Sequence, residues 1–401
     1  GLKLPRNNRY ALIGLLTNLF AIPWVGFLIV PLSLIASLLS FFFYPFASLL
    51  IQFNDLLTIP LLKGVAFFAS IPYASLYVST PTAFEILLFY LLLLSLVHLR
   101  KGKRMKYVFL GLCLIFFLDI TFWNWKGLLQ KNVTITFLDV GQGDSILIEL
   151  PKGKTMLIDG GGLYEDQFDI GKNVVAPFLW KKKIHRIDTL VLTHPDPDHF
   201  KGLNFIASQF SIGQFWDGGL QSDSESYFRL KDILSEKKTE RLTLTEKTPP
   251  QSIKGVELSF FNPPALDEIQ KPKKISSFIN NSSLVIKLRF KNVSFLFPGD
   301  IEKEAEERML RKDYPLKVDV IKIPHHGSLS SSTPLFLEKV KPAYAILSVG
   351  ERNLGRLPHP EVLRRYSELG SRIFRTDRHG AITMITDGEK IEIKTFLKGE
   401  P

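Results

Sequence analysis

The sequence predicts an α+β protein in which two β-sheets flanked by helices follow a helical membrane region. Residues 1–126 are largely apolar, whereas short β runs begin at Val133 and later alternate with helices. This succession is typical of sheets covered by helices. In the segment Leu190-Val-Leu-Thr-His-Pro-Asp-Pro-Asp-His199, an apolar strand leads into two histidines and two aspartates. Such groups are costly to bury unless they are paired or metal-bound, so we expect a functional site where this strand ends. The alternative is a solvated polar loop.

Composition narrows the class of protein. The 401 residues suffice for two or three domains, and because the first residue is Gly rather than Met, we expect a piece of a longer protein. The single cysteine, Cys113, excludes an intramolecular disulfide and a cysteine-based zinc cage. The net charge of +11 divides into +7 for residues 1–126 and +4 for the remainder. A mildly basic second half suits a polyanionic partner, although an ordinary solvated surface gives the same balance.

Residues 1–126 indicate an integral membrane region, because apolar runs of about 20 residues match the thickness of a bilayer core. The clearest predicted spans are Val78–Leu99 and Met105–Trp123, and Trp24–Phe43 is a third candidate that Pro31 should kink. Two further apolar stretches, Arg9–Ala21 and Pro45–Ala69, contain polar interruptions such as Asn54-Asp55. That pair is interpreted equally well as an interfacial loop or as pore lining.

The basic loop Arg100-Lys-Gly-Lys-Arg-Met-Lys106 predicts the orientation. Short loops rich in Lys and Arg stay in the cytoplasm, so one more crossing places everything after Trp125 on the outer side. We therefore expect a multi-pass protein of the inner (plasma) membrane with its C-terminal domain outside. The predicted domains are 1–126, a truncated transmembrane helical region, and 131–401, a hydrolase domain.

The second half is predicted as strands and helices separated by Gly-rich turns and polar loops. The predicted strands are Val133–Asp139, Ser145–Leu150, Thr155–Asp159, Thr189–Thr193, Gly255–Phe261, Leu284–Phe290, Val293–Phe297, Val318–Ile323, Ala343–Val349, Ala381–Thr386 and Lys390–Phe396. The predicted helices are Gly171–Trp180, Phe200–Phe210, Glu225–Glu236, Ile301–Arg311, Thr333–Val340 and Pro360–Leu369. Lys237–Gln251 and Pro263–Ser277 are predicted loops.

Three later segments are candidates to complete the site. Phe297-Pro-Gly-Asp300 and Ile321-Lys-Ile-Pro-His-His-Gly-Ser328 each follow an apolar strand, and Leu357-Pro-His-Pro360 offers one more histidine. If the strands lie side by side, these groups meet at the His194–His199 segment and form a centre for one or two metal ions. Imidazoles and carboxylates around a divalent ion lower the pKa of a bound water. Oxygen-rich sets favour Mn²⁺ or Mg²⁺, and histidine-rich sets favour Zn²⁺; we expect one or two divalent ions, Mn²⁺ or Zn²⁺.

His194-x-Asp-x-Asp-His199 is similar to the HxHxDH signature of the metallo-β-lactamase fold. Five further phrases occur in order behind the membrane spans: Phe137-Leu-Asp-Val-Gly-Gln-Gly-Asp-Ser145, Met156-Leu-Ile-Asp-Gly-Gly161, Pro298-Gly-Asp300, Lys322-Ile-Pro-His-His-Gly-Ser328 and Thr376-Asp-Arg-His-Gly-Ala381. Together these phrases resemble the ComEC family of competence proteins. The resemblance implies an αββα metallo-β-lactamase-like sandwich behind the end of a polytopic DNA channel. It also implies a part in natural competence, with a metal-dependent nuclease that degrades the strand not taken up.

Carried over by position, the resemblance assigns His194 and Asp196 to a first metal, Asp198 and His199 to a second, and Asp300 to a bridge. One of His325 and His326 would close the second site, and because neighbouring strand residues point to opposite faces, we expect only one of the pair to bind. Asp198 and His326 are the expected catalytic groups.

This chain departs from the fold's usual pattern in two ways. Asp196 stands where the signature has a histidine, and no histidine lies between His199 and Asp300. The first site is therefore expected to be weak, Mn²⁺-selective or empty. Further residues are expected to support the site or to contact substrate: Asp139, Asp144, Asp159, Asn281, Ser282, Lys322, Ser328 and His359. Asp139 and Asp144 are more readily explained as turn residues than as ligands, and His379 as a hydrogen-bonding loop residue.

We therefore predict a DNA-uptake channel segment with an outward-facing metal-dependent phosphodiesterase. Its expected partners are DNA, as a single strand or an incoming duplex, membrane lipid and other proteins of the competence machinery. One alternative is an enzyme of the same fold that acts on a small ester or lactone. The other is a degenerate site that only binds or guides DNA, which the missing third histidine favours.

Overall fold

The chain forms two compact units in this computed structural model, one of residues Pro5–Thr80 and one that contains Pro81–Pro401. The structure describes residues 8–162, 168–265, 275–351 and 357–398. The predicted division between 126 and 131 stays a prediction, and the hairpin α4–α5 groups with the C-terminal domain in the second unit.

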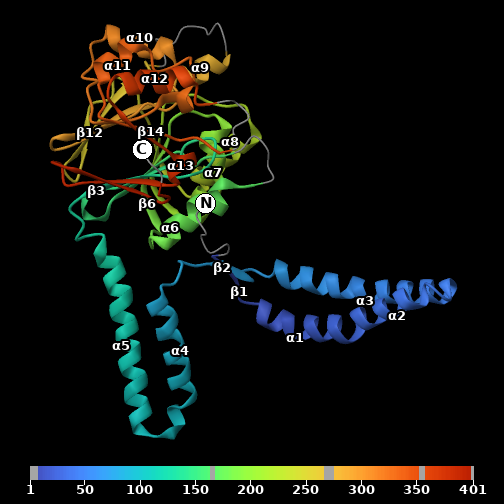
Figure 1. The fold of residues 1–401 in the computed structure, drawn as a ribbon. Coiled ribbons are helices and arrows are strands. Elements are labelled where there is room, and N and C mark those ends of the chain that lie inside the picture. Colours follow the sequence, from blue (N-terminus) through green and yellow to red (C-terminus); the bar gives the residue numbers. More distant parts are fainter. Residues whose placement is uncertain (1–7, 163–167, 266–274, 352–356, 399–401) are drawn as a thin grey trace. The chain divides into compact units, whose positions relative to one another are not determined.

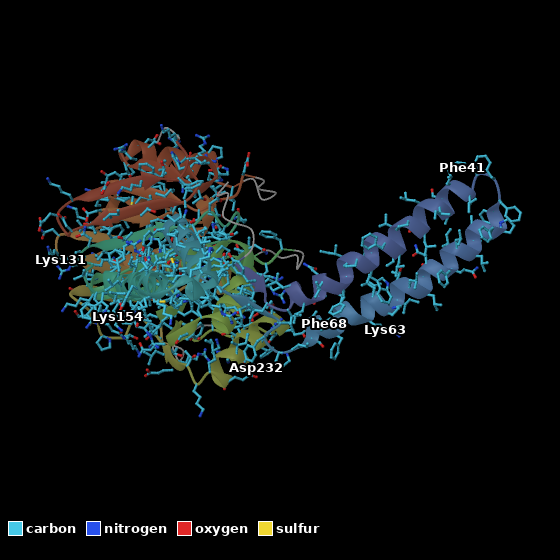
Figure 2. The ribbon with its side chains drawn as sticks, turned by 90° about the horizontal axis from the view of Figure 1, so that it is seen from below. Phe41, Lys63, Phe68, Lys131, Lys154 and Asp232 are labelled. Carbon is cyan, nitrogen blue, oxygen red and sulfur yellow. The ribbon has the colours of Figure 1, made fainter. Side chains whose placement is uncertain are left out.

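The Pro5–Thr80 unit is a helical hairpin closed by a short two-stranded sheet (Figure 1). Its elements are β1 (Arg9–Ala11), α1 (Gly14–Trp24), η1 (Val25–Ile29), α2 (Val30–Leu39), α3 (Tyr44–Ser70) and β2 (Ser75–Tyr77). The run Gly14–Leu39 and helix α3 are both long and apolar enough to cross a membrane. Figure 2 shows side chains along the length of this hairpin, among them Phe41, which is 81% exposed. Outward-facing apolar side chains of this kind are typical of a helix that contacts lipid.

Two predictions about this unit need correction. The span predicted at Trp24–Phe43 begins earlier, because the helical run is continuous from Gly14 to Leu39 and contains the wide turn η1 just before Pro31. Wide turns accommodate the missing N–H of a proline within a helix. Asn54-Asp55 lies inside α3 rather than in a loop, and the Asn54 side-chain amide donates to Ser33 Oγ at 2.7 Å on the neighbouring helix. The Asn54 side chain therefore connects α3 to α2.

The second unit begins with the antiparallel helices α4 (Ala83–Val97) and α5 (Lys103–Lys126), joined through η2 (Leu99–Lys101) (Figure 1). Helix α5 confirms the predicted Met105–Trp123 helix and is long enough to span a bilayer. Helix α4 corrects the prediction for Val78–Leu99, because it has 15 residues and starts at a capping box formed by Thr82 and Glu85. At 1.5 Å per residue it is about 22 Å long, short of a bilayer core of about 30 Å.

Residues 133–398 form two stacked sheets. The eight-stranded sheet has the order β17-β16-β3-β4-β5-β6-β7-β8, and the seven-stranded sheet has the order β15-β14-β13-β12-β11-β10-β9. The strands are β3 (Val133–Phe137), β4 (Ile146–Glu149), β5 (Thr155–Ile158), β6 (Arg186–Leu192), β7 (Ser211–Asp217), β8 (Glu240–Thr243), β9 (Gln251–Ile253), β10 (Val256–Asn262), β11 (Val285–Phe290), β12 (Val293–Phe297), β13 (Val320–Lys322), β14 (Tyr344–Leu347), β15 (Arg372–Arg375), β16 (Ile382–Thr386) and β17 (Ile391–Thr395). Strands β5 to β8 are parallel to one another, as are β12 to β15.

Helices cover the outer faces of both sheets, so the domain is an αββα sandwich (Figure 1). The described helical segments are η3 (Pro151–Gly153), η4 (Gly171–Val175), α6 (Ala176–Lys181), α7 (Pro197–Gln209), α8 (Glu225–Glu236), α9 (Ile275–Asn281), α10 (Lys303–Arg311), η6 (Pro324–Gly327), α11 (Pro334–Val340), α12 (Pro360–Glu368) and α13 (Thr376–His379). One apolar core lies between the sheets, where Phe137 faces Phe297 at 6.3 Å between ring centroids. A second core joins the seven-stranded sheet to α10, α11 and α12. The predicted fold is confirmed.

The predicted elements were most often wrong at the sheet edges. Four strands were not predicted: β7, β8, β9 and β15. In the order of their sheets β8, β9 and β15 are terminal, and β7 is next to a terminus. Edge strands bury little surface, so their sequences lack the apolar alternation by which strands are recognised. Helix α7 begins at Pro197 rather than Phe200, which places Asp198 and His199 in its first turn.

Glu306 is a buried carboxylate that fixes the loop before α11. It lies on α10, and its carboxylate oxygens accept the N–H groups of Ser332 at 2.6 Å and Thr333 at 2.8 Å. Burial raises the pKa of Glu306 to about 7, although the hydrogen bonds from Thr333 and Ser332 favour the charged form.

This pKa predicts a pH dependence of stability. Because the pKa of Glu306 rises on folding from 4.5 to about 7, its contribution to the free energy of unfolding is complete below pH 4.5 and is lost as the pH rises through 7. We expect Glu306→Gln to remove this contribution, so that the difference in thermal unfolding midpoint between the two proteins changes over that interval. Parallel midpoint curves for wild type and variant would contradict the assignment.

Candidate metal centre

Four buried side chains gather at one end of the sandwich: Asp144, His199, Asp300 and His326. One ligand atom from each lies within 4.8 Å of every other. We call these residues the four-residue group. They come from the β3–β4 loop, the first turn of α7, the loop after β12 and the η6 turn after β13. The group therefore joins both sheets.

The topology explains why segments so far apart in sequence meet. Strands β5 and β6 are parallel neighbours in one sheet, and β12, β13 and β14 are parallel neighbours in the other. The carboxyl ends of parallel strands open on the same edge of a sheet, where ligand sites are usually built. The loops that carry Asp159, His199, Asp300 and His326 all start from these ends.

His199 is held in a fixed orientation by Asp159. The Nδ1 atom of His199 lies 2.7 Å from Asp159 Oδ2, and Thr193 donates its hydroxyl to the same oxygen at 2.7 Å. The other oxygen of Asp159 accepts the N–H of Thr193 at 2.8 Å. Nδ1 of His199 therefore carries a proton, and Nε2, which lies 3.3 Å from Asp300 Oδ2, faces the group and can bind an ion once it has lost its own proton. A carboxylate behind a histidine in this way is typical of metal sites.

His326 is oriented in the same manner by the backbone. Its Nδ1 donates to the carbonyl of Ser348 at 2.9 Å, and its Nε2 lies 3.2 Å from Asp300 and 3.6 Å from Asp198. Both His325 and His326 have a left-handed backbone, with φ of 46° and 50°. This conformation is costly for residues other than glycine and is common at functional sites.

His325 points elsewhere. Its Nδ1 lies 3.3 Å from Glu302 Oε1 and 3.3 Å from the hydroxyl of Ser330. The expectation that only one histidine of the pair faces the site agrees with this arrangement. His326 lies in the four-residue group, and His325 lies outside it.

The residues present fit a metal ion. Several buried polar atoms have no hydrogen-bond partner among the residues that the structure describes: Asp144 Oδ1, His194 Nε2, His199 Nε2 and His326 Nε2. A buried nitrogen lone pair without a donor is costly. Three of these four atoms, Asp144 Oδ1, His199 Nε2 and His326 Nε2, belong to the four-residue group. A set of metal ligands without its ion would show the same pattern.

The charges of the group also call for a cation. Four buried carboxylates lie together, those of Asp144, Asp159, Asp198 and Asp300, and one buried ammonium, that of Lys322, contacts Asp144 and lies 3.1 Å from Asp300. Burial lowers the pKa of Lys322, but the carboxylates of Asp144 and Asp300 outweigh burial and hold it above its ordinary value. One ammonium cannot balance four carboxylates, so further positive charge is favoured here.

The imidazoles supply positive charge when no ion does. Burial opposes protonation of His326, yet Asp300 above all raises its pKa to about 10. Asp300 and Asp159 likewise raise the pKa of His199 well above its ordinary value despite its burial. Burial would raise the pKa of Asp300, but His326, Lys322 and His199 hold it well below its ordinary value. Metal ions and protons therefore compete for the same nitrogen atoms.

His194 and Asp196, the predicted first site, lie beside the four-residue group. The ring of His194 is 4.1 Å from that of His199 between centroids, and its Nε2 is 3.7 Å from Asp196 Oδ2. Burial and the neighbouring His199 hold the pKa of His194 well below its ordinary value, so this ring is neutral. Burial and Asp198 raise the pKa of Asp196 to about 6.

Asp144 is the ligand candidate that sequence reasoning undervalued. It was interpreted as a turn residue, whereas it is fully buried within the four-residue group. The Gly141-Gln-Gly143 turn brings it there, because a Cβ on Gly143 would lie 2.2 Å from the carbonyl oxygen of Asp198. An aspartate directly after a turn with two glycines was the signal available in the sequence.

The remaining predicted residues have structural roles or lie beside the group. Asp159 and Lys322 contact it directly, as described above. Asn281 accepts the N–H groups of Glu302 and Ala305, and Ser282 donates to the carbonyl of Phe278. His359 caps α12 by accepting the N–H of Glu361 at 3.2 Å. Ser328 contacts Ser330 at 2.9 Å, and burial raises the pKa of the half-buried Asp139.

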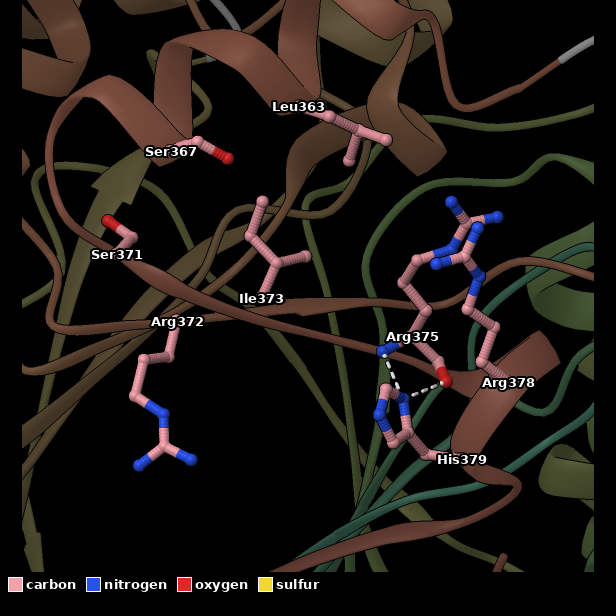
Figure 3. Close-up of a pocket in the computed structure, with 8 residues that line it drawn as sticks. All are labelled: Leu363, Ser367, Ser371, Arg372, Ile373, Arg375, Arg378 and His379. Carbon is pink, nitrogen blue, oxygen red and sulfur yellow. Dashed lines mark hydrogen bonds between the residues drawn. The ribbon is translucent and has the colours of Figure 1, made fainter. Parts of the chain in front are cut away.

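Two residues of the phrase Thr376-Asp-Arg-His-Gly-Ala381, Arg378 and His379, help to line a separate pocket of about 400 Å³ (Figure 3). Arg372, Arg375 and Arg378 are among its lining residues, and Arg375 forms an ion pair with Asp377 at 2.6 Å. His379 Nδ1 lies 3.0 Å from the N–H of Arg375, which agrees with its interpretation as a hydrogen-bonding loop residue. No residue of the four-residue group lines this pocket.

Two sheets packed between helices, with buried histidines and aspartates at the ends of their parallel strands, define a metallo-β-lactamase fold. The chain belongs to the metallo-beta-lactamase superfamily, whose family model matches residues 138–351. A second model, that of the competence protein family, matches residues 4–103. This combination, with the relatives below, supports the resemblance to the ComEC family of competence proteins.

Two relatives extend over most of the chain. ComE operon protein 3 of Bacillus subtilis (strain 168) is 26% identical over 392 residues, which cover 94% of this chain and 48% of that protein. Competence protein ComA of Neisseria gonorrhoeae is 26% identical over 372 residues, covering 92% of this chain and 48% of that protein. The chain thus spans about half the length of these relatives. Among solved structures, the diiron β-hydroxylase CmlA from Streptomyces venezuelae is 15% identical with a TM-score of 0.40, covering 63% of this chain and 54% of that chain.

The contrast between the two neighbouring histidines gives a prediction. We expect His326→Ala to weaken binding of Mn²⁺ or Zn²⁺ at least about 100-fold, because it removes a ligand atom, whereas loss of a supporting residue costs about 10–100-fold. His325→Ala, the matched control, should leave the affinity unchanged. Isothermal titration of the ion-free chain measures both. Equal losses in the two variants would contradict the assignment of His326.

Proposed function

We propose that this chain is the part of a DNA-uptake protein that carries a metal-dependent phosphodiesterase acting on DNA. The observation that carries the proposal is the four-residue group, with unpartnered ring nitrogens on His199 and His326. Membership of a competence family supports DNA as the substrate, and the basic balance of the chain, +11 overall, suits a polyanion.

His199, Asp300, His326 and Asp144 would hold a divalent ion, Mn²⁺ or Zn²⁺. A bound ion would lower the pKa of a water molecule and stabilise negative charge on a phosphoryl oxygen. Asp159 and the Ser348 carbonyl keep the ring protons on the far side of His199 and His326, so that both Nε2 atoms face the ion. Lys322 balances part of the carboxylate charge and limits how many further cations the site needs.

Asp198 is the proposed water-orienting group. It lies in the first turn of α7, 9% exposed, with a carboxylate oxygen 3.6 Å from His326 Nε2. Burial raises the pKa of Asp198, but His199 and His326 outweigh it and keep the group ionised. A carboxylate that stays charged beside the ligands can accept a hydrogen bond from the attacking water and a proton after attack.

Cleavage of DNA tests the proposal. With the full chain in detergent and Mn²⁺, we expect hydrolysis of a labelled single strand, and we expect Asp198→Asn to lower the rate by about 10²-fold or more without weakening DNA binding. Asp232→Asn, which removes an exposed carboxylate on α8 (Figure 2), is the matched control and should leave the rate unchanged.

The other outcomes of that assay are distinct. DNA that binds but is never cut would support the second candidate, a module that only guides DNA, which the presence of Lys322 among the carboxylates favours. Cleavage of small esters or lactones but not of DNA would identify a different hydrolase. Cleavage that survives Asp198→Asn would reject the role of Asp198.

We also propose that the domain faces the outer side of the plasma membrane. Support comes from the cluster of basic residues at η2 and the start of α5, which includes Arg100, Lys101, Lys103 and Arg104. Such short basic loops are retained in the cytoplasm. We expect alkaline phosphatase fused after Lys131 to be active in cells and a cytoplasmic reporter at the same position to be inactive. The reverse result would overturn the orientation.

A further inference from the structure

A basic pocket lies where the last turn of α5 meets the eight-stranded sheet. It has a volume of about 620 Å³ and is lined by the end of α5, the β4–β5 connection and the segment from α6 to β6. Six of its described lining residues carry a Lys or Arg side chain, and one carries a carboxylate, Glu149. The six are Lys126, Lys154, Lys181, Lys182, Lys183 and Arg186. The face is viewed in Figure 2 from the side of α4 and α5, with Lys154 labelled.

Ion pairs neutralise only part of this charge. Lys182 pairs with Glu149, Lys183 with Glu85 at 2.7 Å, and Lys154 and Arg186 share Asp188. Lys126 and Lys181 have no carboxylate partner among the residues that the structure describes. The ammonium of Lys126 lies over the ring of Trp123, 4.4 Å from its centroid. The pocket therefore keeps an excess of positive charge, and this charge is oriented by an aromatic ring.

The position of the pocket identifies its occupant. Trp123, Asn124 and Lys126, which line it, form the last turn of α5, a helix long and apolar enough to cross the membrane. Tryptophan and lysine at the end of such a helix lie at the depth of the lipid headgroups. The covalent structure thus places the pocket at the membrane surface, where the anionic groups in greatest supply are headgroup phosphates.

The size of the pocket also favours a headgroup over a nucleic acid. A pocket of this volume is suited to a small-molecule group, whereas a DNA single strand needs a continuous groove for several nucleotides. We propose that this pocket binds the phosphate of an anionic phospholipid, with Lys126 and Lys181 as its principal contacts. The bound headgroup would fix the domain against the bilayer. This proposal is independent of the nuclease activity.

Lipid binding by the full chain in a neutral detergent tests it. We expect phosphatidylglycerol to be retained in native mass spectra in preference to phosphatidylcholine with the same acyl chains. The double variant Lys126→Gln/Lys181→Gln should lower the apparent affinity for phosphatidylglycerol about thirtyfold, since each lysine near a membrane surface contributes about fivefold. The control, Lys238→Gln/Lys254→Gln, removes two exposed lysines outside the pocket and should change nothing. Equal unfolding midpoints for the two double variants establish that both are folded.

Four results would overturn the proposal. The first is equal retention of the two lipids, and the second is equal loss of lipid affinity in both double variants. The third is displacement of the lipid by glycerol phosphate at comparable concentration, which would identify a site for small free anions. The fourth is displacement by a ten-nucleotide single strand whose own affinity falls in the Lys126→Gln/Lys181→Gln variant, which would make the pocket a DNA contact.

Discussion

The balance of buried charge at the end of the sandwich is the constraint on which the site depends. Four largely buried carboxylates would be strongly unfavourable unless cations neutralised them. Lys322 supplies one positive charge from within the fold, and the histidines supply more when they are protonated. A metal ion would replace those protons rather than fill a neutral cavity. The same arrangement explains why the surrounding hydrogen bonds are so specific. Asp159 and the Ser348 carbonyl decide which nitrogen of each ring is protonated, and thereby which is available to a ligand.

The site can form only when the two sheets are packed against each other. Residues from both sheets meet at the site only because the core between them is continuous, with Phe137 and Phe297 in contact a few residues before Asp144 and Asp300. Glycines then permit the close approach of loops that side chains would prevent. A Cβ on Gly162 would lie 2.1 Å from the carbonyl oxygen of Pro197 at the start of α7. The glycine-rich phrases of the sequence are therefore packing surfaces for α7 as well as turns.

The sequence predicted the sandwich and most of the site because both depend on strong local patterns. Apolar strands that end in His, Asp and Gly mark the ends of the central strands, and they placed His199, Asp300 and His326 correctly near one another. It could not separate His325 from His326, since the left-handed backbone at both positions invalidates the alternation expected in a strand. Asp144 was undervalued because its burial comes from α7, more than fifty residues later in the sequence. The length of α4 was overestimated because the predicted span began at Val78, whereas the capping box of Thr82 and Glu85 starts the helix at Ala83.

The connection between α5 and β3 has a mechanical consequence. Only residues 127–132 separate the two elements, and they are bound to the domain. The Gln130 carbonyl accepts the N–H of Lys152 at 2.9 Å, and its side chain donates to the carbonyl of Glu149 at 3.1 Å. A flexible linker of similar length would let a domain sweep a volume and meet substrate anywhere within it. A bound connection instead holds the four-residue group at a fixed distance and direction from α5, so a substrate must come to the domain. The region that the domain can reach is thus limited by its connection to α5.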